Sequence, residues 1–265
     1  MRIYCPPEHI TQNKITIFER EQICHLRDVM RLKTGARLFV FDGESREYEC
    51  MIKEIAKERV DLAVRSVKKI PKAKGLNVTL ACAIPKKAKI EYIIEKATEL
   101  GVDTIIPLQT ERTIVRISLE SAYNKLKRWQ NIAKEASKQC GRIKLPQVEP
   151  VAGFNNLICR IKAYDLAIIP HLGAGNRHIK DVISNFSRCS GIPLPVSTGS
   201  RLRREKAGKG RSILVLIGPE GDFSQDEIRR SEACGCIGVS LGEFTLKVDT
   251  AAIAAVSFLR LSNIE

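Results

Sequence analysis

Three short segments in the second half of the sequence place glycines beside polar or basic residues, each directly after an apolar run. They are 170–175 (PHLGAG), 218–222 (GPEGD) and 241–247 (LGEFTLK). Glycine lets the backbone come close to a ligand, and the free amide groups of a following helix can donate hydrogen bonds to it. In an open α/β sheet, ligands bind at the carboxyl ends of the strands. The three segments therefore predict one shared binding site.

The sequence disfavours the two commonest nucleotide sites at this place. Gly173 and Gly175 form a Gly-x-Gly pair, but the third glycine of a dinucleotide fingerprint and an acidic residue for the ribose are missing. The chain also lacks the GxxxxGK[ST] loop that binds nucleotide triphosphates. A nicotinamide-dependent enzyme that uses the Gly173–Gly175 pair is kept only as a weak alternative.

The elements that carry these segments alternate between apolar strands and amphipathic helices, which favours a mostly parallel α/β sheet. The expected strands are 77–84, 104–108, 165–169, 213–217 and 237–240. The expected helices are 87–100, 122–140, 176–186, 224–235 and 250–261. Ser224 and Glu227 have the spacing of a capping box, and Asp249 is the expected N-cap of the last helix, rather than a general base.

The N-terminal part of the chain has a different pattern, with strands expected at 15–18, 37–41, 46–55 and 59–70. A helix over 21–31 would place Ile23, Leu26, Val29 and Met30 on one apolar face and leave Arg27 and Arg31 polar. These elements predict a small β-barrel or sheet with one helix. Residues 71–75 look like a linker, so we expect a first domain over 1–72 and a second over 73–265.

The 265-residue chain is basic, with a formal net charge of +14 and a pI near 9.5, and such a chain favours a polyanionic partner. Residues 187–211 form a Gly-, Pro- and Ser-rich insert with seven basic residues and one acidic residue, so this insert supplies +6 of the total. Such a long loop is usually functional or disordered. A flexible solvated insert and an RNA-contacting arm are both compatible with it.

The nine cysteines are odd in number and include no CxxC pair or Cys/His tract with zinc-ligand spacing. We therefore expect neither a disulfide scaffold nor a metal site. The N-terminus has no apolar core of a signal peptide, and no apolar run is long enough to span a membrane. These features predict a protein of the reducing cytoplasm.

Taken together, the C-terminal motifs resemble those of the SPOUT superfamily of S-adenosylmethionine-dependent RNA methyltransferases, and specifically its RsmE family. The family patterns IGPEGGfs..E and LG.RiLRtETA correspond to 217–227 (IGPEGDFSQDE) and 241–252 (LGEFTLKVDTAA). Further family patterns correspond to 25–43, 86–112 and 135–146, so the resemblance extends over nearly the whole chain.

The resemblance implies an N-terminal PUA-like RNA-binding β-barrel followed by a SPOUT-type α/β domain with a C-terminal trefoil knot. Nothing in the periodicity indicates a knot, and knots are rare, so this expectation comes from the family alone. The family methylates N3 of uridine 1498 in bacterial 16S ribosomal RNA. The implied partners are S-adenosylmethionine, which is the methyl donor, and 16S rRNA or the small ribosomal subunit. Proteins of the superfamily are usually homodimers.

By resemblance, one set of residues would enclose the methyl donor. This set is Leu172, Gly173, Gly218, Pro219, Glu220, Gly221, Leu241, Gly242, Leu246, Thr250, Ala251 and Ala252. Without the resemblance, the leucines are equally well explained as strand-end core residues and the glycines as turn residues.

Uracil N3 is a poor nucleophile until it loses its proton, so a cation near the methyl donor should stabilise the developing negative charge. Lys247 is the first candidate for this cation and Arg142 the second. His171 could relay a proton, but a histidine at such a position is more often structural.

By motif match, the candidates for RNA binding are Arg27, Arg31, Lys86 and Arg112. Each of them could also be a solvated residue or part of a structural ion pair.

Five residues depart from the family motifs. Asp222 stands where the family has glycine, Phe244 and Lys247 stand where it has arginine, and Val248-Asp249-Thr250 replaces Thr-Glu-Thr. Lysine keeps the charge of arginine but loses its bidentate fork, and phenylalanine loses both. These departures leave open the alternative of a catalytically inactive RNA- or ribosome-binding protein on the same scaffold.

Overall fold

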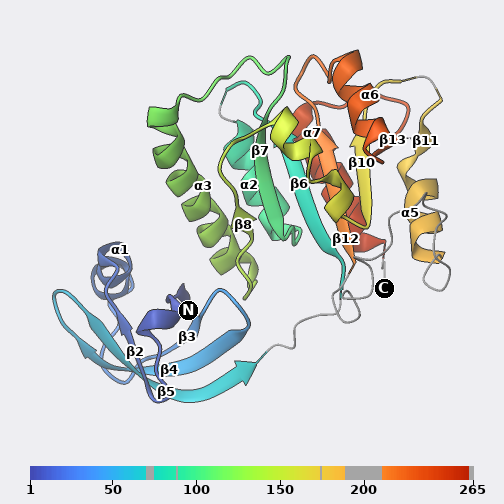
Figure 1. Ribbon diagram of the computed structural model, residues 1–265. Coiled ribbons are helices and arrows are strands. Elements are labelled where there is room, and N and C mark those ends of the chain that lie inside the picture. Colours follow the sequence, from blue (N-terminus) through green and yellow to red (C-terminus); the bar gives the residue numbers. More distant parts are fainter. Residues whose placement is uncertain (70–74, 88, 174, 189–210, 263–265) are drawn as a thin grey trace. The chain divides into compact units, whose positions relative to one another are not determined.

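The chain forms two compact units in the computed structural model (Figure 1). The structure describes residues 1–69, 75–87, 89–173, 175–188 and 211–262. The first unit comprises Met1–Ala73 and Lys134–Leu145, and the second comprises Lys74–Ala133 and Pro146–Glu265. The extents expected for the two domains from the sequence stay predictions. The part of the basic insert between residues 189 and 210, and the linker residues 71–74, lie outside the described residues.

The first unit is built on a mixed five-stranded sheet that curves into a half-barrel (Figure 1). Its strands are β1 (Arg2–Tyr4), β2 (Lys14–Ile17), β3 (Arg37–Phe41), β4 (Arg46–Ile55) and β5 (Val60–Lys69), in the order β1-β3-β4-β5-β2. All pairs are antiparallel except β1 with β3. Alternate side chains such as Leu38, Val40 and Ile52 are buried because successive residues of a strand point to opposite faces.

The helix expected over 21–31 is interrupted. Its first part is the α-helix α1 (Arg20–Cys24), and His25–Val29 forms a π-helical turn in which the Met30 N–H donates to the His25 carbonyl at 2.9 Å. Ile23 and Leu26 are buried, but Val29 and Met30 are 66% and 46% exposed, so the four residues of the expected apolar face are not buried together. The wider turn changes the direction in which the following side chains point.

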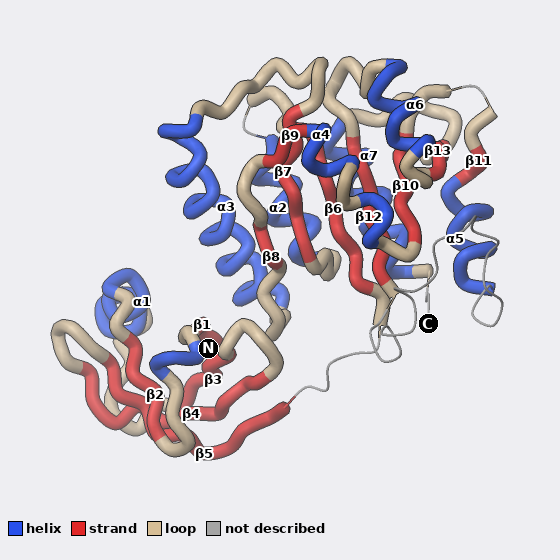
Figure 2. The backbone as a smooth tube through the Cα atoms, viewed as in Figure 1, coloured by secondary structure: helices blue, strands red, loops and turns tan. Residues whose placement is uncertain are grey.

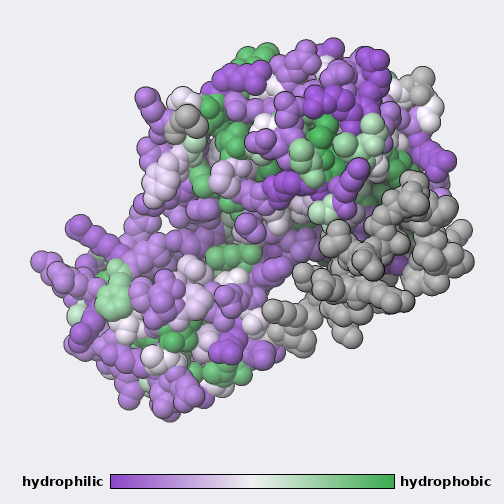
Figure 3. Space-filling view, in the orientation of Figure 1, coloured by the Kyte–Doolittle hydropathy of each residue, from purple (hydrophilic) through white to green (hydrophobic). Residues whose placement is uncertain are grey.

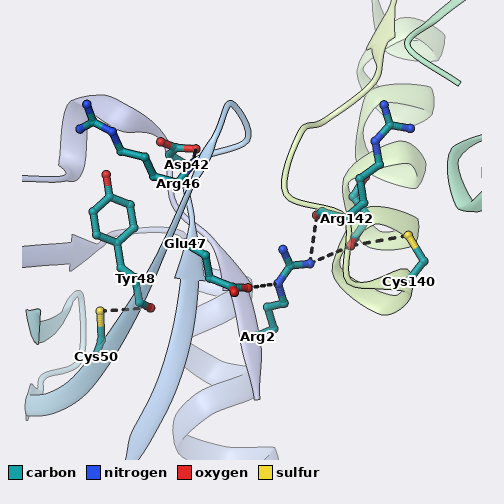
Figure 4. A network of polar contacts seen from close by, with 9 residues as sticks. Arg2, Asp42, Arg46, Glu47, Tyr48, Cys50, Cys140 and Arg142 are labelled. Atoms are coloured by element: carbon teal, nitrogen blue, oxygen red, sulfur yellow. Dashed lines mark hydrogen bonds and ion pairs between the residues drawn. The ribbon is translucent and has the colours of Figure 1, made fainter. Parts of the chain in front are cut away.

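The Arg2 side chain anchors the segment 134–145 within the first unit (Figure 4). Arg2 Nε donates to Glu47 at 2.7 Å, and its Nη1 donates to the carbonyl groups of Ser137 and Arg142 at 3.2 and 3.0 Å. The guanidinium also lies 4.3 Å from the ring centre of Phe41. Strand β1, which the sequence analysis missed, thus supplies the residue that holds this segment.

The second unit is an α/β domain with a mostly buried parallel sheet. Its strands are β6 (Asn77–Ala83), β7 (Thr104–Gln109), β8 (Gln147–Val148), β9 (Ala152–Gly153), β10 (Leu166–Pro170), β11 (Arg177–His178), β12 (Ser212–Ile217) and β13 (Ile237–Ser240). The order is β11-β13-β10-β12-β6-β7-β8, with β9 paired to β7, and every pair is parallel. The four longer apolar runs of the sequence therefore predicted the central strands correctly.

Helices cover both faces of this sheet (Figure 2). They are α2 (Lys89–Glu99), α3 (Leu119–Cys140), α4 (Phe154–Ile158), α5 (Ile179–Arg188), α6 (Gln225–Ala233) and α7 (Val248–Leu261). Side chains of α2, α3, α5 and α7 belong to one hydrophobic core, and those of α4 and α6 belong to a second core on the other face. Burial on both faces explains why the strands are apolar throughout.

The starts of the last two helices differ in how well the sequence predicted them. The capping box of α6 is confirmed, since Ser224 Oγ accepts from the Glu227 N–H and the Glu227 carboxylate accepts from the Ser224 N–H. The prediction that Asp249 caps α7 is wrong, because the helix begins earlier and Lys247 occupies the N-cap position. Asp249 lies in the first turn, where its carboxylate is free to face another element.

The surface of each unit is mostly hydrophilic on the face shown in Figure 3. The eight cysteines in the described ranges are all free thiols, and Cys189 lies outside these ranges. The described residues contain no cluster of three side chains suited to a metal ion. No described helix combines the length and the apolar composition needed to cross a membrane.

Candidate functional site

A cavity of about 490 Å³ lies at the carboxyl ends of four neighbouring strands of the second unit. Its walls come from the segments that follow β6, β10, β12 and β13 and from the start of α7. The strands are parallel and adjacent in the order β13-β10-β12-β6, so the loops that leave them meet at one edge of the sheet. Segments from the three glycine-containing stretches therefore meet in one cavity.

Most of the residues expected around the methyl donor line this cavity. They are Leu172, Gly218, Pro219, Glu220, Leu241, Gly242, Leu246 and Ala251. The other four, Gly173, Gly221, Thr250 and Ala252, are not part of the lining. Gly173 and Gly221 are next to lining residues, whereas Ala252 is fully buried below the start of α7. The roles of all twelve in binding a ligand stay predictions.

The loop after β12 is held from two sides. Arg112 Nη1 donates to the Gly221 carbonyl at 2.8 Å, and the Glu220 carboxylate accepts from the backbone N–H of Lys86 at 2.9 Å. A turn within the loop is closed by the Asp222 N–H, which donates to the Pro219 carbonyl at 2.9 Å. Arg112 therefore positions this loop, a role that the sequence analysis missed.

His171 lines the cavity but is not arranged to accept a proton. Its Nδ1 accepts a hydrogen bond from the Gly173 N–H at 3.0 Å, so the proton of the neutral ring lies on Nε2. The Nε2 atom is buried and has no hydrogen-bond partner among the residues that the structure describes. These contacts support the structural alternative for this histidine.

Basic side chains line one part of the cavity. Lys247 is exposed there, together with Lys86 and Lys87 from the segment after β6, and Lys89 at the start of α2 is half-buried. Lys86 was expected from the sequence, but Lys87 and Lys89 were missed, although they also follow a predicted strand.

Arg142, the second candidate for stabilising the uracil, belongs to the first unit. Its backbone carbonyl there accepts a hydrogen bond from Arg2.

The two candidates for RNA binding in the first domain have different surroundings. The Arg27 guanidinium donates two hydrogen bonds to the Asp28 carboxylate, at 2.7 and 2.9 Å. Arg31 follows the π-helical turn and has a positive φ of 50°. Both side chains are accessible, and their predicted contact with RNA stays a prediction.

Asp249 lies in the cavity wall, where its carboxylate pairs with Lys89 Nζ at 3.1 Å. Burial by itself would raise the pKa of Asp249. The hydrogen bond and charge of Lys89, together with amide groups at the start of α7, outweigh burial and lower this pKa. The pair ties α7 to α2 at the edge of the cavity.

Removing this ion pair should destabilise the protein at neutral pH and not in acid. Because the pKa of Asp249 is lowered by folding, the stabilisation is complete above the unfolded-state pKa of about 3.9 and is lost as the pH falls through the folded-state value. We expect Lys89→Met to lower the free energy of unfolding by about 1 kcal/mol at pH 7. Denaturant titrations from pH 7 to pH 3 measure the free energy of unfolding of Lys89→Met against that of the unsubstituted protein. Lys86→Met is the control. A loss of stability in Lys89→Met that is the same at every pH would contradict this account.

Comparison with known proteins identifies the family. Residues 18–65 match the profile of an RNA methyltransferase PUA domain, and residues 72–260 match that of an RNA methyltransferase domain. Ribosomal RNA small subunit methyltransferase E of Synechocystis sp. is 30% identical over 259 residues, which cover 97% of this chain and 76% of that protein. The chain belongs to the ribosomal RNA small subunit methyltransferase E family.

Two further relatives agree with this assignment. The methyltransferase E of Bacillus subtilis is 29% identical over 238 residues, covering 89% of this chain and 86% of the relative. A Legionella pneumophila protein described as a methyltransferase, solved in complex with the bound cofactor SAM, has 31% identity and a TM-score of 0.80 over 98% of this chain and 97% of that one. The family expected from the sequence motifs is confirmed, as is a PUA domain followed by a parallel α/β domain.

Proposed function

We propose that this protein transfers a methyl group from S-adenosylmethionine to ribosomal RNA of the small subunit. The observation that carries the proposal is the cavity at the carboxyl ends of β6, β10, β12 and β13, which the family motifs line. Membership of the methyltransferase E family and the SAM complex of the Legionella relative support it.

The residues of the cavity fit this methyl donor. Its volume of about 490 Å³ lies within the range of small-molecule sites. Leu241, Leu246 and Ala251 offer an apolar wall for the adenine ring, and the carboxylate of Glu220 suits the positive charge of the donor. Bound there, S-adenosylmethionine would supply an electrophilic methyl group.

The nucleoside that we propose is uridine 1498, methylated at N3. The new N–CH3 bond forms as the S–CH3 bond breaks, which leaves the electron pair on sulfur as S-adenosylhomocysteine, and the N3 proton passes to solvent water. Because such a displacement needs in-line positioning, the chain has mainly to orient the uracil and stabilise its negative charge. Lys247 is the candidate for that stabilisation because it is exposed at the cavity, at the N-cap position of α7.

Arginine and lysine side chains should supply most of the affinity for RNA. Lys86 at the cavity and Arg27 and Arg31 on the first unit are candidates for phosphate contacts, as is Arg112, whose guanidinium is also bound to the loop after β12. The net charge of +14 agrees with a polyanionic substrate. Arg142 is the second candidate for stabilising the reacting uracil.

The proposal includes a homodimer and a C-terminal trefoil knot. One stripe of α7 supports the dimer, because Ile253, Ala254 and Ser257 are only half-buried and Leu261 is 75% exposed. Analytical ultracentrifugation tests the dimer, and a monomer at micromolar concentration would contradict it.

The knot is tested by pulling the unfolded chain by its ends. A knotted chain should give an extension shorter than that of an unknotted 265-residue chain.

Calorimetry with S-adenosylmethionine tests the activity. Saturable binding is expected. Its absence would favour the alternative of an inactive RNA-binding scaffold. That alternative is suggested by Phe244, which replaces the arginine of the family motif and is 81% exposed at the cavity. If binding is seen, methyl groups are mapped on small subunits from a strain that lacks the enzyme. A methyl group on another nucleotide would overturn the uridine assignment.

A methyl added at Gly218 should impair the methyl-donor site. Its Cβ would lie 3.0 and 3.1 Å from ring atoms of Phe223 and 3.2 Å from the Asp222 carboxylate, so the buried Phe223 ring must give way by a few tenths of an ångström. We expect Gly218→Ala to weaken S-adenosylmethionine binding about ten-fold and to cost about 1–3 kcal/mol of stability. Gly153→Ala is the control, because a Cβ there meets nothing within 4 Å. Unchanged binding in calorimetry would contradict the placement of the donor.

A further inference from the structure

Asp222 has an uncommon backbone conformation for its residue type. Its φ is +60°, in the left-handed region where glycine is favoured, and asparagine and aspartate are the other residues tolerated there. The family motif has glycine at this position. The backbone shape of the loop is therefore compatible with either residue, and the carboxylate is an addition of this chain.

The carboxylate of Asp222 joins two loops of the cavity. One oxygen accepts from the N–H of Phe223 at 2.8 Å, and the other accepts from the N–H of Leu172 at 3.2 Å. Leu172 is fifty residues away in sequence, in the loop after β10. A glycine at position 222 would keep the loop but could make neither of these side-chain bonds.

Residues 171–173 are also tied to β13 by the His171 N–H, which donates to the Val239 carbonyl at 3.3 Å, but few contacts tie them to the loop after β12. The ladder between β10 and β12 ends at the pair Ile168–Val215, before either loop begins. In the part of the chain that the structure describes, no other hydrogen bond joins residues 171–173 to residues 218–223. The Leu172 side chain is 71% exposed at the cavity, so core packing does not fix it.

We propose that Asp222 is a positioning residue that fixes the Leu172 loop against the loop after β12 and so preorganises the wall of the methyl-donor cavity. This inference rests on the proposed function, since it assigns the cavity to S-adenosylmethionine. A wall held in place before binding loses less conformational freedom when the ligand arrives, and this improves affinity.

The chain provides a matched control at the other end of the same two strands. The Asp165 carboxylate accepts from the backbone N–H and the Oγ of Ser212, both at 2.8 Å, and so joins the start of β10 to the start of β12. It is a comparable side-chain link between these strands, but it does not line the cavity.

The test compares Asp222→Gly with Asp165→Gly. For Asp222→Gly in the ligand-free protein, amide hydrogen exchange at Leu172 should become at least about ten-fold faster, while Tm changes little because glycine suits the positive φ. The Kd and KM for S-adenosylmethionine should rise about five- to ten-fold, with an unchanged KM for rRNA. Asp165→Gly should lower Tm and leave both constants for S-adenosylmethionine unchanged.

The outcomes separate this inference from the proposed function. Unchanged exchange at Leu172 in Asp222→Gly, or faster exchange with unchanged Kd and KM for S-adenosylmethionine, would overturn the positioning role. If the unsubstituted protein fails to bind S-adenosylmethionine at all, the proposed function fails. The exchange measurement needs no ligand, so it would then still decide whether Asp222 holds the Leu172 loop.

Discussion

Replacing Lys247 by alanine is expected to lower kcat for RNA methylation by about 100-fold or more, while the Kd for RNA changes by less than about three-fold. The uracil becomes negatively charged as N3 loses its proton, and a cation at the cavity is worth most at that stage. Lys247 is exposed in the cavity lining, and its backbone, rather than its side chain, caps α7. Single-turnover methylation and RNA binding by fluorescence anisotropy measure the two quantities.

Two further variants make this prediction specific. Lys247→Arg restores the residue type of the family motif and should keep most of the activity, because it retains the charge. Lys127→Ala on α3 removes an exposed lysine that does not line the cavity, and it should leave kcat unchanged. Equal losses of kcat and RNA affinity in Lys247→Ala would instead mark this lysine as an ordinary phosphate contact.

Glu227→Ala is expected to cost about 2–4 kcal/mol of folding stability, which is the largest structural effect that we predict. The side chain is only 4% exposed, and its two oxygens accept from the backbone N–H groups of Ser224 and Glu111, at 3.0 and 2.9 Å. Alanine leaves the buried Ser224 N–H and the partly buried Glu111 N–H without this acceptor and removes half of the capping box. Equilibrium denaturation by guanidinium chloride measures the loss.

The neighbouring carboxylate provides the control for Glu227. Asp226 lies in the same first turn of α6 but is exposed, and its contact is an ion pair with Arg230 at 3.6 Å. Asp226→Ala should therefore cost less than about 0.5 kcal/mol. Similar losses in the two variants would show that the helix-end charge, and not the buried hydrogen bonds, accounts for the effect of Glu227.

Local sequence patterns were sufficient for the central elements of the second unit. The apolar runs that became β6, β7, β10 and β12 are buried on both faces, so their composition alone distinguishes them, whereas the shorter strand β13 is only partly buried. The spacing of Ser224 and Glu227 predicted the start of α6 because a capping box is made within four consecutive residues. Patterns of this kind fail where neighbouring turns differ in geometry, as in the π-helical turn at His25–Val29.

The sequence by itself determined the family, the alternation of strands and helices, and the strand-end segments that meet at the cavity. Only the tertiary structure decided which residues hold those segments together. Lys89 with Asp249, Arg112 with Gly221, and Asp222 with Leu172 are each separated by at least fifty residues. Such pairs leave no periodicity in the sequence, because the contact depends on how the parallel strands are ordered in the sheet.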